Sequence, residues 1–206
     1  MTDGRNILVC GRTGTGKSYL LKQLTRDADR LIVYGPKREE HDWSGVYFDG
    51  MEPQGLKGFA WWFYHTVNTC RRFRIVYRPA DLFDIHEFDV VANLVYACGN
   101  VVFVCEELMT YTTERNIEQG FKRLLVAGRT RGITCYMVTQ RPFKIPREVT
   151  SQAREAYIFA THEPTDLDYC RQTFGIELIL KLDQLKEYEH VHWIETGHVE
   201  IGKAIA

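Results

Sequence analysis

The chain has 206 residues, with 26 lysines and arginines against 27 aspartates and glutamates, which leaves a formal net charge of −1. A content of 45% hydrophobic and 26% charged residues is typical of a globular protein, and it excludes a disordered chain, a collagen-like repeat and a disulfide-stapled miniprotein. A free-standing nucleic-acid binder usually carries a basic excess, which this chain lacks. We expect one domain over residues 1–206.

Three features lead us to expect a cytoplasmic protein. The longest apolar segment, Phe59–Tyr64, has six residues, whereas a membrane-spanning helix needs roughly 20. The first residues also lack the charged and then apolar pattern of a signal peptide. Six cysteines are scattered without a C-x-x-C pair, several of them in apolar segments, which indicates reduced, buried thiols.

Short β-branched segments alternate with amphipathic ones along most of the chain. The strand candidates are Ile7–Cys10, Leu31–Tyr34, Arg74–Tyr77, Val101–Cys105, Ile133–Thr139 and Ala156–Ala160, and the helical patterns lie at 17–27, 56–70, 86–98, 114–127 and 165–173. This alternation predicts an α/β fold with a mainly parallel sheet and helices on both faces.

The pattern changes after about residue 186. Two segments of period two, Tyr188–Ile194 and His198–Ile201, predict a C-terminal β-hairpin. We therefore expect a core at about 6–161, followed by an extension of helix and hairpin at about 162–206.

A phosphate-binding loop follows the first strand. Gly11–Ser18 fits the pattern G-x-x-x-x-G-K-[ST], and a helical segment comes directly after it. Backbone amides of such a loop surround phosphate oxygens. We expect Lys17 to bind the β- and γ-phosphates of ATP and Ser18 to bind Mg²⁺. The expected nucleotide-binding residues are Gly11, Arg12, Thr13, Gly14, Thr15, Gly16, Lys17, Ser18 and Tyr19.

Two adjacent carboxylates follow the apolar segment Val101–Cys105. Catalytic groups of α/β proteins lie at the carboxyl ends of such strands. We expect Glu106 to hold Mg²⁺ through water and Glu107 to polarise the water that attacks the γ-phosphate. Aspartate is more common at the first of these positions, so Glu106 departs from the usual pattern.

A third strand, Ile133–Thr139, ends in Gln140-Arg141-Pro142. A glutamine there would sense the γ-phosphate or position the attacking water. Together with the phosphate loop and the acidic pair, this strand end resembles the FtsK/HerA superfamily of DNA-pumping ATPases. The small size is most similar to the genome-packaging ATPases of tailless icosahedral viruses, many of which have an internal membrane. The similarity extends from about Asn6 to Thr161.

The resemblance implies a RecA-like P-loop NTPase core, a hexameric ring, and ATP hydrolysis completed by an arginine of the neighbouring subunit. In this superfamily the arginine lies eleven residues before the strand-end glutamine, which corresponds to Arg129, with Arg131 as the competing candidate. Such an arginine neutralises charge that develops in the transition state.

The resemblance also implies translocation of double-stranded DNA into a preformed capsid, in the cytoplasm of the host cell or in association with the virion. The ring would dock on a capsid vertex or on a membrane-associated viral protein. A ring brings the few cationic side chains of each subunit together around a central pore. A chain with a near-neutral net charge could therefore still bind DNA. The candidate DNA contacts are Arg115, Arg141, Lys144 and Arg147.

Two other classes of function stay open at this point. A GTPase or small-molecule kinase uses the same phosphate loop, but the chain has no N-K-x-D guanine signature, and a kinase would not need Gln140-Arg141-Pro142. A nucleotide-binding scaffold or assembly switch with little turnover is the other alternative. Glu106 in place of aspartate favours it, whereas the presence of Glu107 and Arg129 favours an ATPase.

Overall fold

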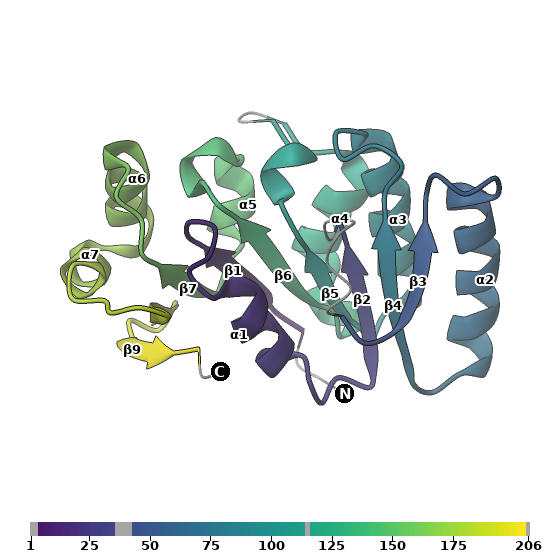
Figure 1. Cartoon of the computed structure of the whole chain (residues 1–206), viewed down its shortest axis with the longest axis horizontal. Coiled ribbons are helices and arrows are strands. Elements are labelled where there is room, and N and C mark those ends of the chain that lie inside the picture. The colour runs from purple at the N-terminus through teal and green to yellow at the C-terminus, as the bar shows by residue number, and fades with distance from the viewer. Residues whose placement is uncertain (1–3, 36–42, 114–115, 205–206) are drawn as a thin grey trace.

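The computed structural model describes residues 4–35, 43–113 and 116–204. These residues form one nine-stranded sheet in the order β3-β4-β2-β5-β6-β1-β7-β8-β9 (Figure 1). The strands are β1 (Asn6–Cys10), β2 (Arg30–Tyr34), β3 (Val46–Asp49), β4 (Phe73–Arg78), β5 (Val102–Cys105), β6 (Thr134–Thr139), β7 (Glu155–Phe159), β8 (Glu189–Ile194) and β9 (Val199–Lys203). Strands β1 to β7 pair in parallel, whereas β8 and β9 are antiparallel, which confirms the predicted sheet and hairpin.

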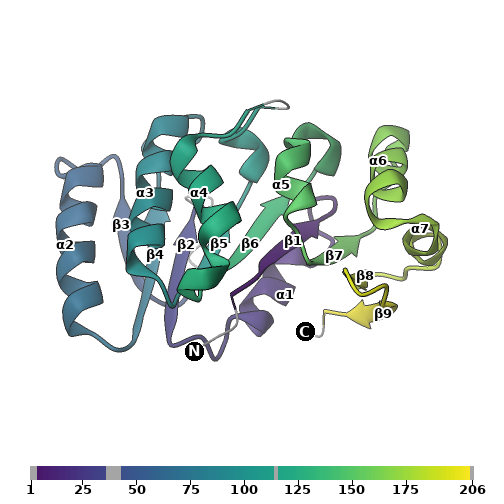
Figure 2. The same cartoon turned by 180° about the vertical axis from the view of Figure 1, so that it is seen from behind.

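The helices cover the two faces of the sheet unequally. They are α1 (Lys17–Leu24), α2 (Gly55–Thr69), α3 (Ile85–Cys98), α4 (Gln119–Ala127), α5 (Arg147–Ser151), α6 (Pro164–Phe174) and α7 (Ile176–Leu182), with short 3₁₀ helices η1 (Leu108–Thr110), η2 (Arg129–Arg131) and η3 (Pro142–Lys144). Helix α1 lies in front of the sheet in Figure 1, and α3, α4 and α5 cover the opposite face in Figure 2. No helix among the described residues is long and apolar enough to cross a membrane.

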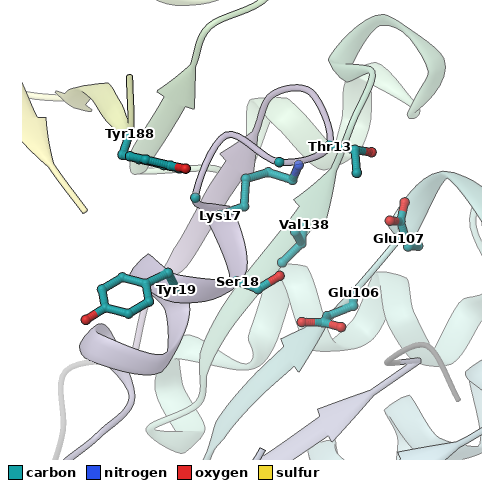
Figure 3. Close-up of a pocket in the computed structure, with 10 residues that line it drawn as sticks. Thr13, Lys17, Ser18, Tyr19, Glu106, Glu107, Val138 and Tyr188 are labelled. Atoms are coloured by element: carbon teal, nitrogen blue, oxygen red, sulfur yellow. The ribbon is translucent and has the colours of Figure 1, made fainter. Parts of the chain in front are cut away.

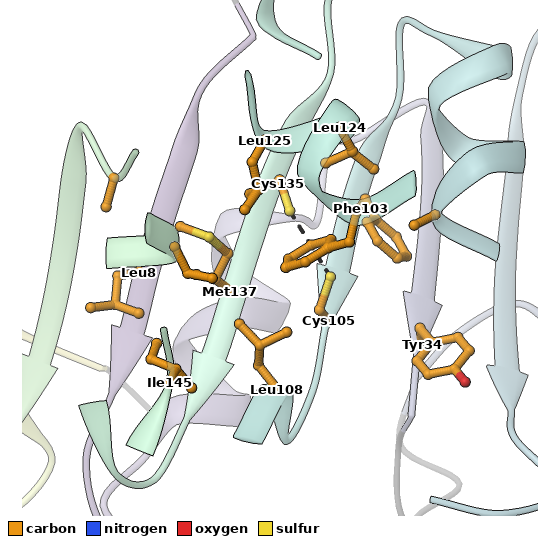
Figure 4. Packing of buried hydrophobic residues seen from close by; sticks show 14 of the residues in the cluster. Leu8, Tyr34, Phe103, Cys105, Leu108, Leu124, Leu125, Cys135, Met137 and Ile145 are labelled. Carbon is orange, nitrogen blue, oxygen red and sulfur yellow. Dashed lines mark hydrogen bonds between the residues drawn. The ribbon is translucent and has the colours of Figure 1, made fainter. Parts of the chain in front are cut away.

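Alternation along the strands separates two apolar cores. Leu8, Phe103 and Met137 point into the larger core, beneath α2 to α7 (Figure 4). Their neighbours Val9 and Val138 point to the other face, where Leu20 and Leu21 of α1 meet them. These strands are buried on both faces. For this reason their sequences are continuous apolar segments.

Several elements differ from the sequence-based expectation. Strand β3 was not predicted, because this short edge strand is partly exposed and lacks an apolar signature. Helix α4 begins only at Gln119, since Thr113 and Asn116 form an isolated antiparallel bridge ahead of it. The sequence did not predict where the hairpin lies: Ile158 of β7 pairs with Val191 of β8, so the hairpin continues the main sheet. Cys70 is exposed, against the expectation of buried thiols.

The strand order brings the three sequence motifs to one edge. Strand β6 lies between β5 and β1, and these three strands are parallel, so their carboxyl ends share an edge. The phosphate loop follows β1, Glu106 and Glu107 follow β5, and Gln140 follows β6. Residues far apart in sequence thereby surround one site.

Candidate nucleotide-binding site

A cavity of about 430 Å³ lies at this edge of the sheet (Figure 3). It is lined by Thr13, Gly14, Gly16, Lys17, Ser18, Tyr19, Glu106, Glu107, Val138 and Tyr188. The lining therefore joins the predicted phosphate loop, the predicted acidic pair and one residue from the C-terminal part of the chain.

The phosphate loop is shaped by glycines and by its lysine. Gly11 has φ of 143°, and a Cβ atom there would lie 2.6 Å from Cβ of Phe159, so only glycine fits. Lys17 Nζ donates to the carbonyl oxygens of Gly11 and Arg12, at 2.7 and 2.8 Å. Gly16 is the N-cap of α1 and has no side chain that could bind the first amides of the helix. Loop, lysine and helix start thus suit a polyphosphate.

Ser18 and Glu106 carry oxygen atoms of the kind that bind a magnesium ion. Figure 3 shows the Ser18 hydroxyl and the Glu106 carboxylate directed toward one another across the cavity. Glu106 is only 7% exposed, and hydroxyl and carboxylate oxygens are the hard ligands that Mg²⁺ prefers. Both side chains line the same cavity, so the residues present fit the metal.

Glu107, Gln140 and Thr13 form a chain of hydrogen bonds. Nε2 of Gln140 donates to both carboxylate oxygens of Glu107, at 2.9 and 3.0 Å. Oε1 of the same amide accepts from the Thr13 hydroxyl at 3.0 Å. The backbone of Glu107 is left-handed, with φ of 53°. Gln140, at the end of β6, thus connects the carboxylate that follows β5 to the phosphate loop.

The two candidate arginines lie at the opposite edge of the sheet. Both belong to η2, before β6, whereas Gln140 follows β6. This strand has six residues and spans roughly 20 Å. Arg131 donates from Nε and Nη2 to the carbonyl oxygens of Tyr96 and Ala97, at 2.7 and 2.9 Å, and stacks on the Tyr96 ring. Arg129 is exposed, and its side chain has no hydrogen bond or ion pair with the described residues.

The candidate DNA contacts have different surroundings. Arg141 is 30% exposed and pairs with the fully buried Asp166, and more loosely with Glu163 at 3.7 Å. Lys144 and Arg147 are exposed near the same edge as the cavity, in η3 and at the start of α5. Arg115 lies outside the described residues. Arg141 therefore anchors the segment after Gln140, while Lys144 and Arg147 are available for a ligand.

Sequence reasoning missed Tyr188 as a residue of the site. It precedes β8 at the C-terminal end of the chain and contacts the phosphate loop only through the tertiary fold. Its sequence neighbours contain no nucleotide-binding pattern. The only local signal is a turn before an alternating segment, and such a turn does not predict contact with a ligand.

No protein-family model matches the sequence, and no curated protein matches it either. The fold and the phosphate loop are those of a P-loop NTPase. Among solved structures, the genome packaging NTPase B204 from Sulfolobus turreted icosahedral virus 2, in complex with AMPPCP, has a TM-score of 0.77 at 19% identity, over 100% of both chains.

More distant structures share the fold. The N-terminal domain of zonular occludens toxin from Neisseria meningitidis has a TM-score of 0.53 at 11% identity, over 98% of this chain and 95% of that one. The ATPases 2 and 3 of EccC from Thermomonospora curvata give 0.59 at 14% identity, over 97% of this chain and 36% of that one. The fold that the resemblance implied is thus confirmed: this chain has the fold of these solved proteins, among them a genome packaging NTPase.

Proposed function

We propose that this chain is a magnesium-dependent ATPase that translocates double-stranded DNA into a preformed viral capsid as a ring-shaped motor. The observation that carries the ATPase assignment is the hydrogen-bonded chain from Thr13 through Gln140 to Glu107, whose two end residues line one cavity. It connects a phosphate-binding loop to a carboxylate suited to polarise water. The catalytic roles fall to Lys17, Glu106, Glu107 and Gln140.

An arginine from a neighbouring subunit completes the site in this proposal. No arginine is among the described residues that line the cavity. Arg129 lies at the far edge of its own sheet and so serves the site of another copy. Arg131 is held by the carbonyl oxygens at the end of α3, which favours Arg129 over Arg131. A homo-oligomeric ring, proposed here as a hexamer, follows from this arrangement.

DNA contact is assigned to the segment directly after Gln140. Arg141 and the amide of Phe143 both bind Asp166, which fixes η3 relative to α6. Lys144 and Arg147 are thereby held near the nucleotide cavity. A movement of Gln140 would reach them through the backbone of η3. Contacts of this kind bind phosphates of any sequence. The motor would act in the cytoplasm of the infected cell or bound to the virion, docked on a capsid vertex or a membrane-associated viral protein.

The test is ATP turnover by the purified protein with and without long double-stranded DNA, at two salt concentrations. Glu107→Gln serves as the blank, because it keeps the shape of the side chain and removes the base. Turnover that DNA stimulates, and that high salt suppresses, supports the motor. ATP binding without turnover in either condition would favour an assembly switch instead. Turnover that requires a small-molecule acceptor would identify a kinase.

A further inference from the structure

Tyr188 combines a bulky side chain with a backbone conformation that such residues avoid. Its φ is 61°, and the only other described non-glycine residues with positive φ are Asn100 and Glu107. For a bulky residue this conformation is strained and persists only where the surrounding structure imposes it. Glu107 and Tyr188 both line the nucleotide cavity. Two of the three strained residues therefore belong to the same site.

The C-terminal hairpin fixes the position of Tyr188. The amide of Ala204, which follows β9, donates to the Tyr188 carbonyl at 3.0 Å. The tyrosine lies in a turn whose ends are joined twice: the Glu189 amide donates to the Lys186 carbonyl at 3.1 Å, and the Lys186 amide donates to Oε2 of Glu189 at 2.9 Å. Both ends of the hairpin therefore hold the residue, which explains how the left-handed backbone is maintained.

The ring of Tyr188 lies against the phosphate loop. A Cβ atom at Gly16 would be 3.5 Å from Cδ1 of Tyr188, which places the ring beside the start of α1. The side chain is nevertheless 46% exposed, so part of the ring is free to contact a ligand. In Figure 3, Tyr188 and Tyr19 lie on one side of the loop, and Glu106 and Glu107 lie on the other. The cavity thus has an acidic side and an aromatic side.

We propose that Tyr188 packs against the nucleobase of the bound nucleotide and so forms a base subsite built by the C-terminal hairpin. This inference rests on the proposed function, which directs the γ-phosphate toward Glu107 and hence the base toward the tyrosines. Aromatic rings stack on every base, because every base has an apolar face. The charged side chains of the lining, Lys17, Glu106 and Glu107, are used for phosphates, metal and water. The subsite therefore accepts any nucleoside triphosphate, and purines bind more tightly because they have the larger face.

The experiment measures binding of ATP, CTP and inorganic tripolyphosphate by titration calorimetry. Glu107→Gln is the background, so that ATP is not consumed. We expect Tyr188→Gly to weaken ATP binding between about five- and a hundredfold, CTP binding less, and tripolyphosphate binding not at all. Tyr188→Phe keeps the ring and is expected to retain affinity. Tyr64→Ala removes an exposed tyrosine of α2 outside the cavity and serves as the matched control.

The glycine variant also separates binding from folding. Glycine adopts positive φ without strain, so Tyr188→Gly is expected to keep or raise the thermal midpoint while it loses ATP affinity. Unchanged ATP affinity in Tyr188→Gly overturns the base subsite. Equal losses for ATP and tripolyphosphate overturn it too, since they would mean that the ring only supports the loop. If the Glu107→Gln variant with Tyr188 intact binds neither ATP nor tripolyphosphate, the proposed function itself fails.

Discussion

The side-chain amide of Gln140 donates to both carboxylate oxygens of Glu107, at 2.9 and 3.0 Å. The carboxylate that is suited to polarise water is thus held by the residue that directly follows the neighbouring strand β6. Gln140 also accepts from Thr13 of the phosphate loop, so one side-chain amide joins the loop to Glu107.

Gln140→Ala is expected to lower ATP turnover by about a hundredfold, because Glu107 loses the partner that orients it. Binding of ATP is expected to change little, since Lys17 and the loop amides remain. Steady-state turnover and equilibrium binding measure the two effects separately. The control is Gln184→Ala, an exposed glutamine outside the cavity. Full turnover in Gln140→Ala would contradict the role of this bridge.

Lys17→Ala is expected to weaken ATP binding at least about tenfold, because an ammonium group in contact with phosphate oxygens forms charge-assisted hydrogen bonds. In the structure Nζ is held by the carbonyl oxygens of Gly11 and Arg12, so it already lies within the loop. Lys57→Ala, an exposed lysine of α2, is the control. Equal ATP affinity in the two variants would exclude the assigned role of Lys17.

Arg129→Ala is expected to bind ATP and to fail to hydrolyse it. Mixing this variant with Glu107→Gln subunits is expected to restore part of the activity, because some interfaces then combine an intact arginine with an intact glutamate. Turnover is measured as a function of the mixing ratio. Absence of any rescue would count against an arginine supplied by a neighbouring subunit.

Arg131→Ala is expected to behave differently, because this side chain binds the carbonyl oxygens of Tyr96 and Ala97 at the end of α3. Loss of these charge-assisted hydrogen bonds should lower the free energy of unfolding by about 1 to 3 kcal/mol. Chemical denaturation of Arg129→Ala and Arg131→Ala compares the two. If Arg129→Ala destabilised the fold and Arg131→Ala did not, the two assignments would have to be exchanged.

The double variant Lys144→Ala, Arg147→Ala is expected to bind double-stranded DNA more weakly. The loss should be the same for DNA of any sequence, because in this proposal both side chains bind phosphates. The slope of log affinity against log salt should fall by about one for each of the two cations removed. Binding is measured over a series of salt concentrations, with Lys57→Ala as control. An unchanged slope would mean that other residues bind the DNA.

The burial of His190 predicts that the folded protein loses stability as the pH falls. It is 4% exposed and its Nδ1 has no hydrogen-bond partner among the described residues. Burial, with a smaller contribution from His192, lowers the pKa of His190 to about 4, from an ordinary value near 6.5. Between these values the unfolded chain takes up a proton and the folded chain does not. Stability is therefore full above pH 6.5 and falls as the pH drops toward 4, by up to about 3 kcal/mol in total.

Urea denaturation between pH 7.5 and pH 5.0 measures this effect. His190→Leu removes the titrating group and keeps a similar volume, so its stability should change less over this range. A pH dependence as steep as that of the unsubstituted protein would assign the effect to other groups.

The sequence by itself determined the α/β class, the phosphate loop, the acidic pair and the strand-end glutamine. Each of these is a local pattern: Gly11–Ser18 extends from the end of β1 into the first residues of α1, and the residues after β5 and β6 follow their strands directly. Parallel strands end at a common edge, so the sequence also predicted that these groups lie near one another.

The tertiary structure alone decided which groups touch. The order β5-β6-β1 brings Gln140 between Glu107 and Thr13, and the burial of Asp166 engages Arg141 in an ion pair. The antiparallel pairing of β8 with β7 brings Tyr188 to the nucleotide cavity. These contacts join residues that are distant along the chain, and they depend on strand order and packing, which no local pattern encodes.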